Sequence, residues 1–243
     1  MDRTGKIDQA ARKVKAEIAQ EERLSKAAAV SEEQKQNLRN TCRIECKDIR
    51  LLLPQEITDV KAVITDPPYP SEFLPLFEDL AKLCINVPVV AVMSGQNWFP
   101  FAMGLLCRHL KYRWLLSYLT PGKTYDAKDR GMASTWKPIL LFGEKIKNNV
   151  RDVYVSAVPD KEYHEWGQSL SGMMDIVSCL TEPGDLVLDP FVGGGATAEA
   201  CVRLNRRFIG YDIDQNFVDK SWNRCLIASE EMKKEAQSDN RQV

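Results

Sequence analysis

The sequence contains few residues of the kinds that hold metal ions. Among its 243 residues there are two histidines, and its seven cysteines include no Cys-x-x-Cys pair. The sequence therefore offers no convincing zinc-binding set, and we expect no metal ion in this protein. Cysteines that serve only as small buried thiols are typical of a reducing cytoplasm.

Long apolar segments and an excess of charge are also absent. The longest apolar run, near residues 87–93, is too short to cross a bilayer, and the first residues form no apolar signal region. We therefore expect a cytoplasmic protein with no membrane association. The net charge of −1, from 33 basic and 34 acidic side chains, argues against a purely electrostatic nucleic-acid binder but allows a local basic face.

Composition divides the chain into three segments. Residues 1–40 are rich in Ala, Glu, Lys and Gln, which predicts a polar helical extension with a break near Ser31. Two roles fit this extension: a helix that binds a partner protein or a second copy of the chain, or a solvated arm. Residues 41–230 alternate between apolar strands and amphipathic helices and form the predicted domain, whereas residues 231–243 are polar and predict a loose tail.

The middle segment predicts an α/β fold, with one mostly parallel, Rossmann-like sheet and helices on both faces. Short apolar strands between helices are typical of such a sheet. Strands are predicted at residues 42–46, 62–65, 87–93, 112–119, 138–142, 186–188 and 208–212. Helices are predicted at residues 72–84, 99–110, 173–180, 196–204 and from 216 onward, and residues 120–136 are predicted to form an exposed loop.

The first motif with a chemical meaning is Asp66-Pro67-Pro68-Tyr69, directly after a predicted strand. The two prolines hold the backbone extended, so the segment should project beyond the carboxyl end of its strand, where open α/β sheets bind ligands. A carboxylate and a backbone carbonyl can accept both hydrogens of a planar amine, while the tyrosine ring stacks on it. The alternative is a proline-rich turn whose tyrosine only packs.

The second motif runs from Asp189 through Phe191, Gly193 and Gly195 to Thr197, and reads as a strand, a glycine turn and a helix start. The next strand ends at Asp212, whose carboxylate could bind ribose hydroxyls. This spacing also satisfies a dinucleotide fingerprint. The late position of the turn, and an Asp66 motif with no evident role in hydride transfer, favour S-adenosylmethionine over a nicotinamide cofactor.

Together the two motifs resemble the permuted, β-class amino-methyltransferases of DNA, in which the catalytic motif precedes the cofactor motif. The resemblance covers about residues 42–228 and is closest to small adenine-specific enzymes of the phage and orphan type. It implies the S-adenosylmethionine-dependent methyltransferase fold. It also implies methyl transfer to the N6 amine of an adenine that has flipped out of DNA.

The resemblance also implies a role for each site residue. Asp66 and the Pro67 carbonyl would accept the amine hydrogens, and Tyr69 would stack on the base. The residues that would bind the cofactor are Asp48, Gln168, Asp189, Phe191, Gly193, Gly195, Thr197 and Asp212. For Asp48 the alternative is a helix cap before Ile49. Relatives often carry a lysine near position 168, and its absence here leads us to assign Gln168 to the methionine carboxylate.

A basic segment predicts the surface that binds nucleic acid. Between Arg108 and Arg151 ten Lys and Arg residues stand against three acids, with aromatic residues between them. We expect the DNA contacts in the loop at Lys123, Lys128 and Arg130, whereas Trp114 and Tyr118 are expected in the core. Three alternatives remain open: N4-cytosine methylation, methylation of RNA bases, and a catalytically silent nucleic-acid-binding protein that keeps the fold.

Overall fold

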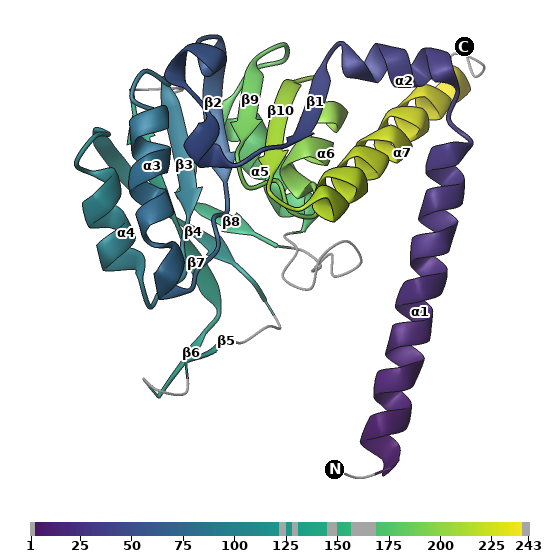
Figure 1. Ribbon diagram of the computed structural model, residues 1–243, viewed down its shortest axis with the longest axis horizontal. Helices are drawn as coiled ribbons and strands as arrows, with labels where there is room; N and C mark the ends of the chain where they lie inside the picture. The colour runs from purple at the N-terminus through teal and green to yellow at the C-terminus, as the bar shows by residue number, and fades with distance from the viewer. Residues whose placement is uncertain (1–2, 122–124, 128–130, 145–149, 157–168, 240–243) are drawn as a thin grey trace.

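The structure is a computed structural model that describes residues 3–121, 125–127, 131–144, 150–156 and 169–239. An eight-stranded sheet runs through it in the order β1-β10-β9-β2-β3-β7-β4-β8 (Figure 1). The strands are β1 (Cys42–Cys46), β2 (Val60–Thr65), β3 (Val89–Met93), β4 (Tyr112–Leu119), β7 (Trp136–Gly143), β8 (Val153–Val155), β9 (Leu186–Asp189) and β10 (Arg207–Asp212).

Five neighbouring strands, β1, β10, β9, β2 and β3, are parallel to one another. Strand β7 is antiparallel to both β3 and β4, and the edge strand β8 is parallel to β4. The predicted mostly parallel sheet is therefore confirmed. Its short Val- and Ile-rich strands are buried on both faces, which explains why they read as continuous apolar runs.

Helices cover both faces of the sheet. Along β2, Ala62 and Ile64 pack in the same cluster as Ile176 of α5, whereas Val63 packs with Leu80 of α3 on the opposite face. The helices of the first face are α5 (Leu170–Leu180), α6 (Ala196–Arg203) and α7 (Gln215–Asp239), and those of the second face are α3 (Pro75–Leu83) and α4 (Phe99–Leu106). This arrangement confirms the helices that the sequence predicts on both faces.

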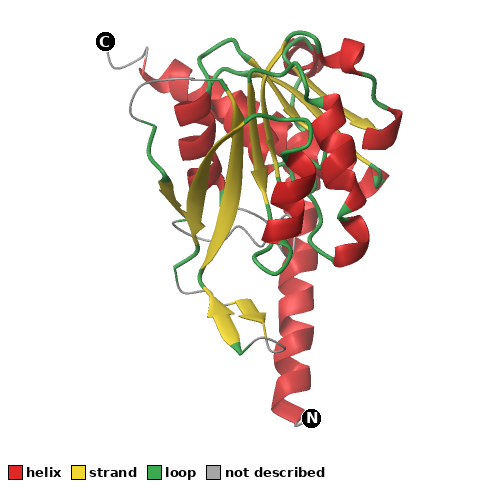
Figure 2. Ribbon diagram, turned by 90° about the vertical axis from the view of Figure 1, so that its left-hand side faces the viewer, coloured by secondary structure: helices red, strands yellow, loops and turns green. Residues whose placement is uncertain are grey.

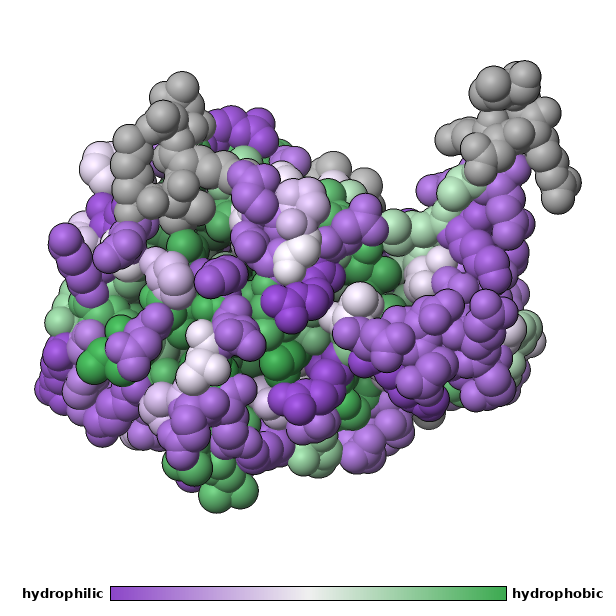
Figure 3. Space-filling model, turned by 90° about the horizontal axis from the view of Figure 1, so that it is seen from above, coloured by the Kyte–Doolittle hydropathy of each residue, from purple (hydrophilic) through white to green (hydrophobic). Residues whose placement is uncertain are grey.

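The amino-terminal extension consists of α1 (Arg3–Ala28) and α2 (Glu32–Arg39). The predicted break between the two helices is present. There the Ser31 hydroxyl accepts a hydrogen bond from the Gln34 amide and caps α2. The carboxyl end of α1 packs on α7 while its amino-terminal part projects from the domain (Figure 1), where Val14 and Ile18 are exposed. Seen from above, the side of the molecule that carries this extension is mostly hydrophilic (Figure 3).

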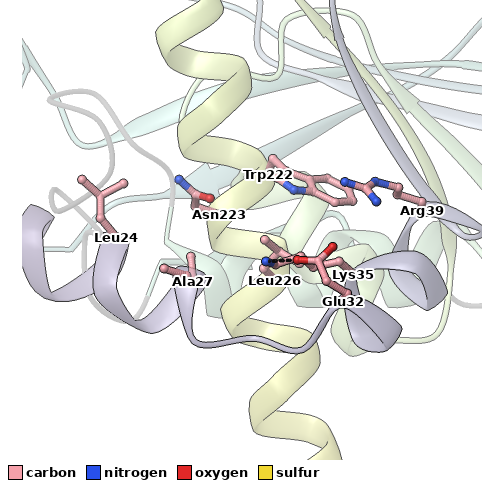
Figure 4. Close-up of a pocket in the computed structure, with 9 residues that line it drawn as sticks. Leu24, Ala27, Glu32, Lys35, Arg39, Trp222, Asn223 and Leu226 are labelled. Atoms are coloured by element: carbon pink, nitrogen blue, oxygen red, sulfur yellow. Dashed lines mark hydrogen bonds and ion pairs between the residues drawn. The ribbon is translucent and has the colours of Figure 1, made fainter.

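A cavity of about 420 Å³ lies where α1, α2 and α7 meet (Figure 4). Arg39 lies over the Trp222 ring on one side of it, with 5.9 Å between the guanidinium carbon and the ring centroid. Of the predicted active-site residues that the structure describes, none lines this cavity. Its lining residues are Leu24, Ala27, Ala28, Glu32, Lys35, Arg39, Trp222, Asn223 and Leu226.

Several segments differ from the sequence predictions. The loop at residues 120–136 contains a small hairpin of β5 (Tyr125–Ala127) and β6 (Met132–Ser134), which extends away from the large sheet (Figure 2). Helix α7 continues to Asp239, so the predicted loose tail is helical over most of its length. Three short 3₁₀ helices flank β2. Two precede the strand, η1 (Ile49–Leu51) and η2 (Pro54–Ile57), and one follows it, η3 (Ser71–Phe73).

Two aromatic residues of β4, Trp114 and Tyr118, have opposite environments. Tyr118 is fully buried as predicted, but Trp114 is 56% exposed, so its assignment to the core was wrong. Strand β8 pairs only with residues 117–119 of β4. Among the described strands, none pairs with the amino-terminal half of β4 on the side of β8, so Trp114 lies at the edge of the sheet.

Among the helices that the structure describes, none combines the length and the apolar character required to span a membrane.

Candidate active site

Two turns that lie more than a hundred residues apart in sequence meet at one edge of the sheet. Strands β2 and β9 are parallel neighbours, with Val63 opposite Leu188. From β2 the chain continues to β3 on one side, and from β9 it continues to β10 on the other. In α/β sheets, ligands bind outside the carboxyl ends of the strands at such a reversal of strand order.

A buried hydrogen bond joins the two turns. The Thr65 hydroxyl, at the end of β2, donates to Asp189 Oδ1 over 2.6 Å at the end of β9. The Phe191 amide donates to the same oxygen, and the Thr197 hydroxyl also bonds to this carboxylate. Complete burial raises the pKa of Asp189 from an ordinary value of 3.8 to about 6, although these hydrogen bonds oppose the rise. Asp189 therefore orders the turn from inside the protein, through the Thr65 hydroxyl and the Phe191 amide.

The amides of the glycine turn are used inside the protein. The Gly193 amide donates to Asp212 Oδ2 over 3.0 Å, and the Val192 and Gly195 amides donate to backbone carbonyls. Together with the Phe191 amide, which donates to Asp189, four backbone amides of the turn donate to protein oxygens. The pyrophosphate of a dinucleotide requires backbone N–H groups of this turn as hydrogen-bond donors, so this arrangement disfavours the dinucleotide interpretation of the motif.

Two side chains of helix α7 bind backbone carbonyls of the glycine turn. The Ser221 hydroxyl donates to the Gly193 carbonyl over 2.7 Å, and the Arg224 guanidinium donates to the Gly194 carbonyl over 3.1 Å. Arg224 is 2% exposed and forms an ion pair with Glu199 of α6 at 2.5 Å. The turn is thus held on both sides by groups that the sequence motif does not contain.

Two glycines of the turn, Gly193 and Gly195, have left-handed backbone and serve different purposes. A Cβ at Gly195 (φ +76°) would lie 2.9 Å from the Ser221 backbone, so this glycine permits α6 and α7 to pack closely. A Cβ at Gly193 (φ +46°) would meet only the Phe191 carbonyl oxygen, at 3.9 Å. The space beside Gly193 is open, and it adjoins Asp212, whose neighbour Ile213 is 74% exposed.

The Asp66 turn has a different construction, because here side chains contact one another, whereas at the glycine turn side chains bind backbone groups. Pro67 is buried, whereas Asp66 and Tyr69 are half-buried. The Tyr69 hydroxyl donates a short hydrogen bond to Asp66 Oδ1. Lys137 of β7 lies on the other side, with its Nζ 3.6 Å from Asp66 Oδ2 and 5.0 Å from the centroid of the Tyr69 ring.

The loop after β3 completes this side of the site. A Cβ at Gly95 would lie 3.1 Å from the Tyr69 ring, so the glycine leaves room for the ring. The Gln96 amide group donates to the Trp136 carbonyl over 3.2 Å and ties the loop to β7. Gly95 and the Asp66 turn are therefore direct neighbours.

Asp48 lies at the same edge as Asp212. It follows β1, whose last residue, Cys46, is opposite Asp212 in the sheet. Its carboxylate accepts a hydrogen bond from the Arg50 amide and caps η1, and the Arg50 guanidinium bonded to it holds its pKa below the usual range. The structure thus shows the cap that was the alternative for this residue.

The remaining predicted residues are Gln168, Lys123, Lys128 and Arg130, and all four lie outside the described residues. The structure adds Thr65, Lys137, Ser221 and Arg224 to the site. Of these, Lys137 belongs to the basic segment of the sequence. It is 7% exposed, and the strand pattern around it contains no signal that distinguishes a buried lysine from a solvated one. Within the described part of the chain, no three His, Cys, Asp or Glu side chains are grouped to hold a metal ion.

Curated relatives of the chain are bacterial type II methyltransferases. It is 52% identical to M.BglII of Bacillus subtilis over 44 residues, which are 18% of this chain and 12% of the relative. It is 23% identical to M.HpaI of Haemophilus parainfluenzae over 233 residues, with 75% of this chain and 73% of the relative covered. The first match therefore spans only a small part of that relative's length.

Solved structures show the same fold. The complex of M1.HpyAVI with SAM is 23% identical, with a TM-score of 0.63 over 75% of this chain and 98% of that chain. The cytosine-N4-specific PvuII DNA methyltransferase is 16% identical, with a TM-score of 0.65 over 76% and 86%. The sequence model of the N6/N4 methyltransferases, described as a DNA methylase, matches residues 89–223, more than half of the chain. The chain therefore belongs to the DNA methylase family.

Proposed function

We propose that this protein is an S-adenosylmethionine-dependent DNA methyltransferase of the permuted class, which methylates the N6 amine of a flipped-out adenine. The observation that carries the proposal is the meeting of the Asp66 turn and the glycine turn at adjacent strand ends, joined through Thr65 and Asp189. A site for the acceptor amine and a site for a nucleoside cofactor then lie side by side, as a direct transfer between two ligands requires.

The residues at the glycine turn fit the cofactor. Open space at Gly193 allows a ligand to approach the backbone, Asp212 offers acceptors for ribose hydroxyls, and exposed Ile213 offers an apolar surface to the adenine ring. Phe191 would line the methionine end. The other residues of the proposed set are Asp48, Gln168, Asp189, Gly195 and Thr197, of which Gln168 is assigned from the sequence alone. When bound, S-adenosylmethionine supplies a methyl group on a positively charged sulfonium.

The residues at the Asp66 turn fit the acceptor amine. The lone pair of an exocyclic amine is delocalised into its ring, so the amine is a poor nucleophile. Hydrogen bonds from its two N–H groups to Asp66 and to the Pro67 carbonyl would favour a pyramidal nitrogen and stabilise the positive charge that it gains. Asp66 Oδ1 or Oδ2 is then placed to hold the proton that the nitrogen must lose. Because Tyr69 would stack on the base, the base has to leave the duplex.

Two parts of the proposal, the target base and the kind of nucleic acid, depend on the resemblance rather than on the geometry of the site. The same carboxylate and carbonyl would also serve the N4 amine of cytosine, and the similar PvuII enzyme is cytosine-N4-specific. The nucleic acid is proposed to be DNA from the family, with methylation of RNA and a silent binding protein as alternatives. The amino-terminal extension is the proposed contact for a second copy or a partner protein, and a cytoplasmic location is expected.

Nucleoside mass spectrometry tests the function directly. DNA and RNA from cells that express the wild-type chain are compared with those from cells that express Asp66→Ala. We expect N6-methyladenine in the DNA of the wild-type culture alone. N4-methylcytosine would correct the base, a methylated nucleoside confined to RNA would correct the substrate, and no new methylated nucleoside would favour the silent binding protein.

The proposed DNA surface is the segment that contains the β5–β6 hairpin. It extends from the sheet beside β4 and β7 (Figure 1). Replacing Lys123, Lys128 and Arg130 by Ala should weaken DNA binding and flatten its salt dependence by about one unit of slope for each phosphate that the variant no longer neutralises. Binding constants measured over a range of salt concentrations check this, and parallel plots for wild type and variant would rule the loop out.

A further inference from the structure

Lys137 is a buried cation at the candidate active site. The residue is 7% exposed, and its Nζ lies 3.6 Å from Asp66 Oδ2. Burying an ammonium group is costly unless an opposite charge accompanies it. The partner here is the carboxylate to which the proposed function gives the central role, so the lysine and the acid have to be considered as one unit.

Protein groups face both oxygens of the Asp66 carboxylate. The Tyr69 hydroxyl donates to Oδ1, and Lys137 faces Oδ2. An incoming amine needs one of these oxygens, and the Tyr69 hydroxyl competes with it as a hydrogen-bond donor. Tyr69 is half-buried at the end of a turn, and its ring is proposed to stack on the base. The hydroxyl is therefore the group that gives way when a base enters.

Lys137 is held much more firmly than Tyr69. It belongs to β7, which pairs with β3 on one side and with β4 on the other, where Lys137 lies opposite Tyr118. A residue in a central strand keeps its backbone position when a surface turn rearranges. The ammonium can therefore continue to hold one carboxylate oxygen while the other turns to the amine.

We propose that Lys137 is a positioning residue, which holds the Asp66 carboxylate in the orientation that accepts the amine of the target base. This inference rests on the proposed function. Lys137 acts through Asp66 and forms or breaks no covalent bond. An isolated cation near the amine would oppose the positive charge that the nitrogen gains, and its pairing with Asp66 reduces that opposition.

The test uses the full chain with Lys137→Met, Lys137→Arg and the control Lys82→Met. Lys82 forms an ion pair with Glu78 on α3, so the control removes an exposed lysine with a carboxylate partner. Methyl transfer from labelled S-adenosylmethionine to DNA gives kcat, and calorimetry gives the affinity for S-adenosylmethionine. A crystal structure of Lys137→Met gives the position of the Asp66 carboxylate.

We expect Lys137→Met to reduce kcat by about a hundredfold, which is the scale of a misplaced catalytic group, with cofactor affinity unchanged. Its Asp66 carboxylate should be rotated, and Lys137→Arg, which keeps the charge, should be more active than Lys137→Met. Lys82→Met should behave as wild type. If Lys137→Met does not fold, Lys137→Gln replaces it, because it retains a polar end in the same place.

Three results would overturn the proposal: an unchanged kcat, an Asp66 carboxylate in the same position without the lysine, or a loss of activity that follows an equal loss of cofactor affinity. The last would assign Lys137 to cofactor binding. If wild type itself methylates no nucleic acid, the proposed function fails, and the position of the carboxylate in the crystal still decides whether Lys137 orients Asp66.

Discussion

The two turns of the candidate site are adjacent, yet they are held by different means. At the glycine turn, Asp212, Ser221 and Arg224 bind backbone groups, so its shape is set before any ligand arrives. At the Asp66 turn, prolines stiffen the backbone, while Tyr69 and Lys137 engage the carboxylate. The shape of the glycine turn is thus fixed by the protein itself. Under the proposed function, the Asp66 turn would exchange the hydrogen bond from its own tyrosine for one from the substrate.

The largest effect should come from the turn that carries the acceptor carboxylate. Asp66→Ala should reduce methyl transfer by about a thousandfold, since the variant has no carboxylate to stabilise the developing charge. Cofactor affinity should remain, because Asp66 follows a different strand from the glycine turn. A transfer assay and calorimetry check the two parts. The control is Asp59→Ala, which removes an exposed carboxylate just before the same strand. Equal loss of affinity would show that the two turns are not separate in function.

The link between the turns should make stability depend on pH. The folded Asp189 carboxyl has a pKa of about 6 and the unfolded one 3.8, so between these values the folded protein retains a proton that the unfolded chain has released. Stability from this group should therefore fall as pH rises from about 4 to 6, by about 3 kcal/mol in the free energy of unfolding.

Urea unfolding of wild type and Asp189→Asn at several pH values measures that contribution. The variant cannot ionise at this position, so its stability should change less over the same pH range. Identical pH slopes for the two proteins would show that Asp189 ionises as freely when folded as when unfolded, and that burial at the end of β9 has no such effect.

Two glycines of the glycine turn, Gly193 and Gly195, should differ in what their substitution changes: ligand binding for the first and stability for the second. Gly195→Ala places a Cβ 2.9 Å from Ser221 at a φ of +76° and should lower the free energy of unfolding by about 3 kcal/mol. Gly193→Ala adds its methyl group to open space, so it should cost less stability and weaken the binding of S-adenosylmethionine instead.

Thermal unfolding and calorimetry separate these two effects. Gly104→Ala is the control, because a Cβ there meets no atom within 4 Å and its backbone is helical. The comparison between the turns would fail if Gly193→Ala bound the cofactor as tightly as wild type.

The smallest effect should come from the support behind the turn. Ser221→Ala removes one hydrogen bond to the Gly193 carbonyl and should weaken cofactor binding by about 1 kcal/mol, or about fivefold. Ser238→Ala, on the exposed part of the same helix, is the control. Unchanged affinity in Ser221→Ala would mean that Asp212 and Arg224 alone suffice to hold the turn.

Local sequence patterns predicted most elements of this fold. Strands β1 and β4 have the predicted bounds, and the break between α1 and α2 is at Ser31. Capping, proline stiffness and apolar alternation act over a few residues, so a linear pattern reveals them. The end of α7 was less predictable. The tail from residue 231 is polar, but it continues α7 to Asp239, because the packed part of the helix has already nucleated it.

The sequence by itself determined that Asp66 and the glycine turn each follow a buried strand, because the strand pattern and the adjoining prolines or glycines are local. Only the tertiary structure decided that these strands are neighbours, that the amides of the glycine turn are occupied, and that Lys137 is buried beside Asp66. Lys137 follows Asp66 by more than seventy residues, and in one dimension it is one more lysine of a basic segment. Strand order brings the two charges together, and burial makes their pairing obligatory.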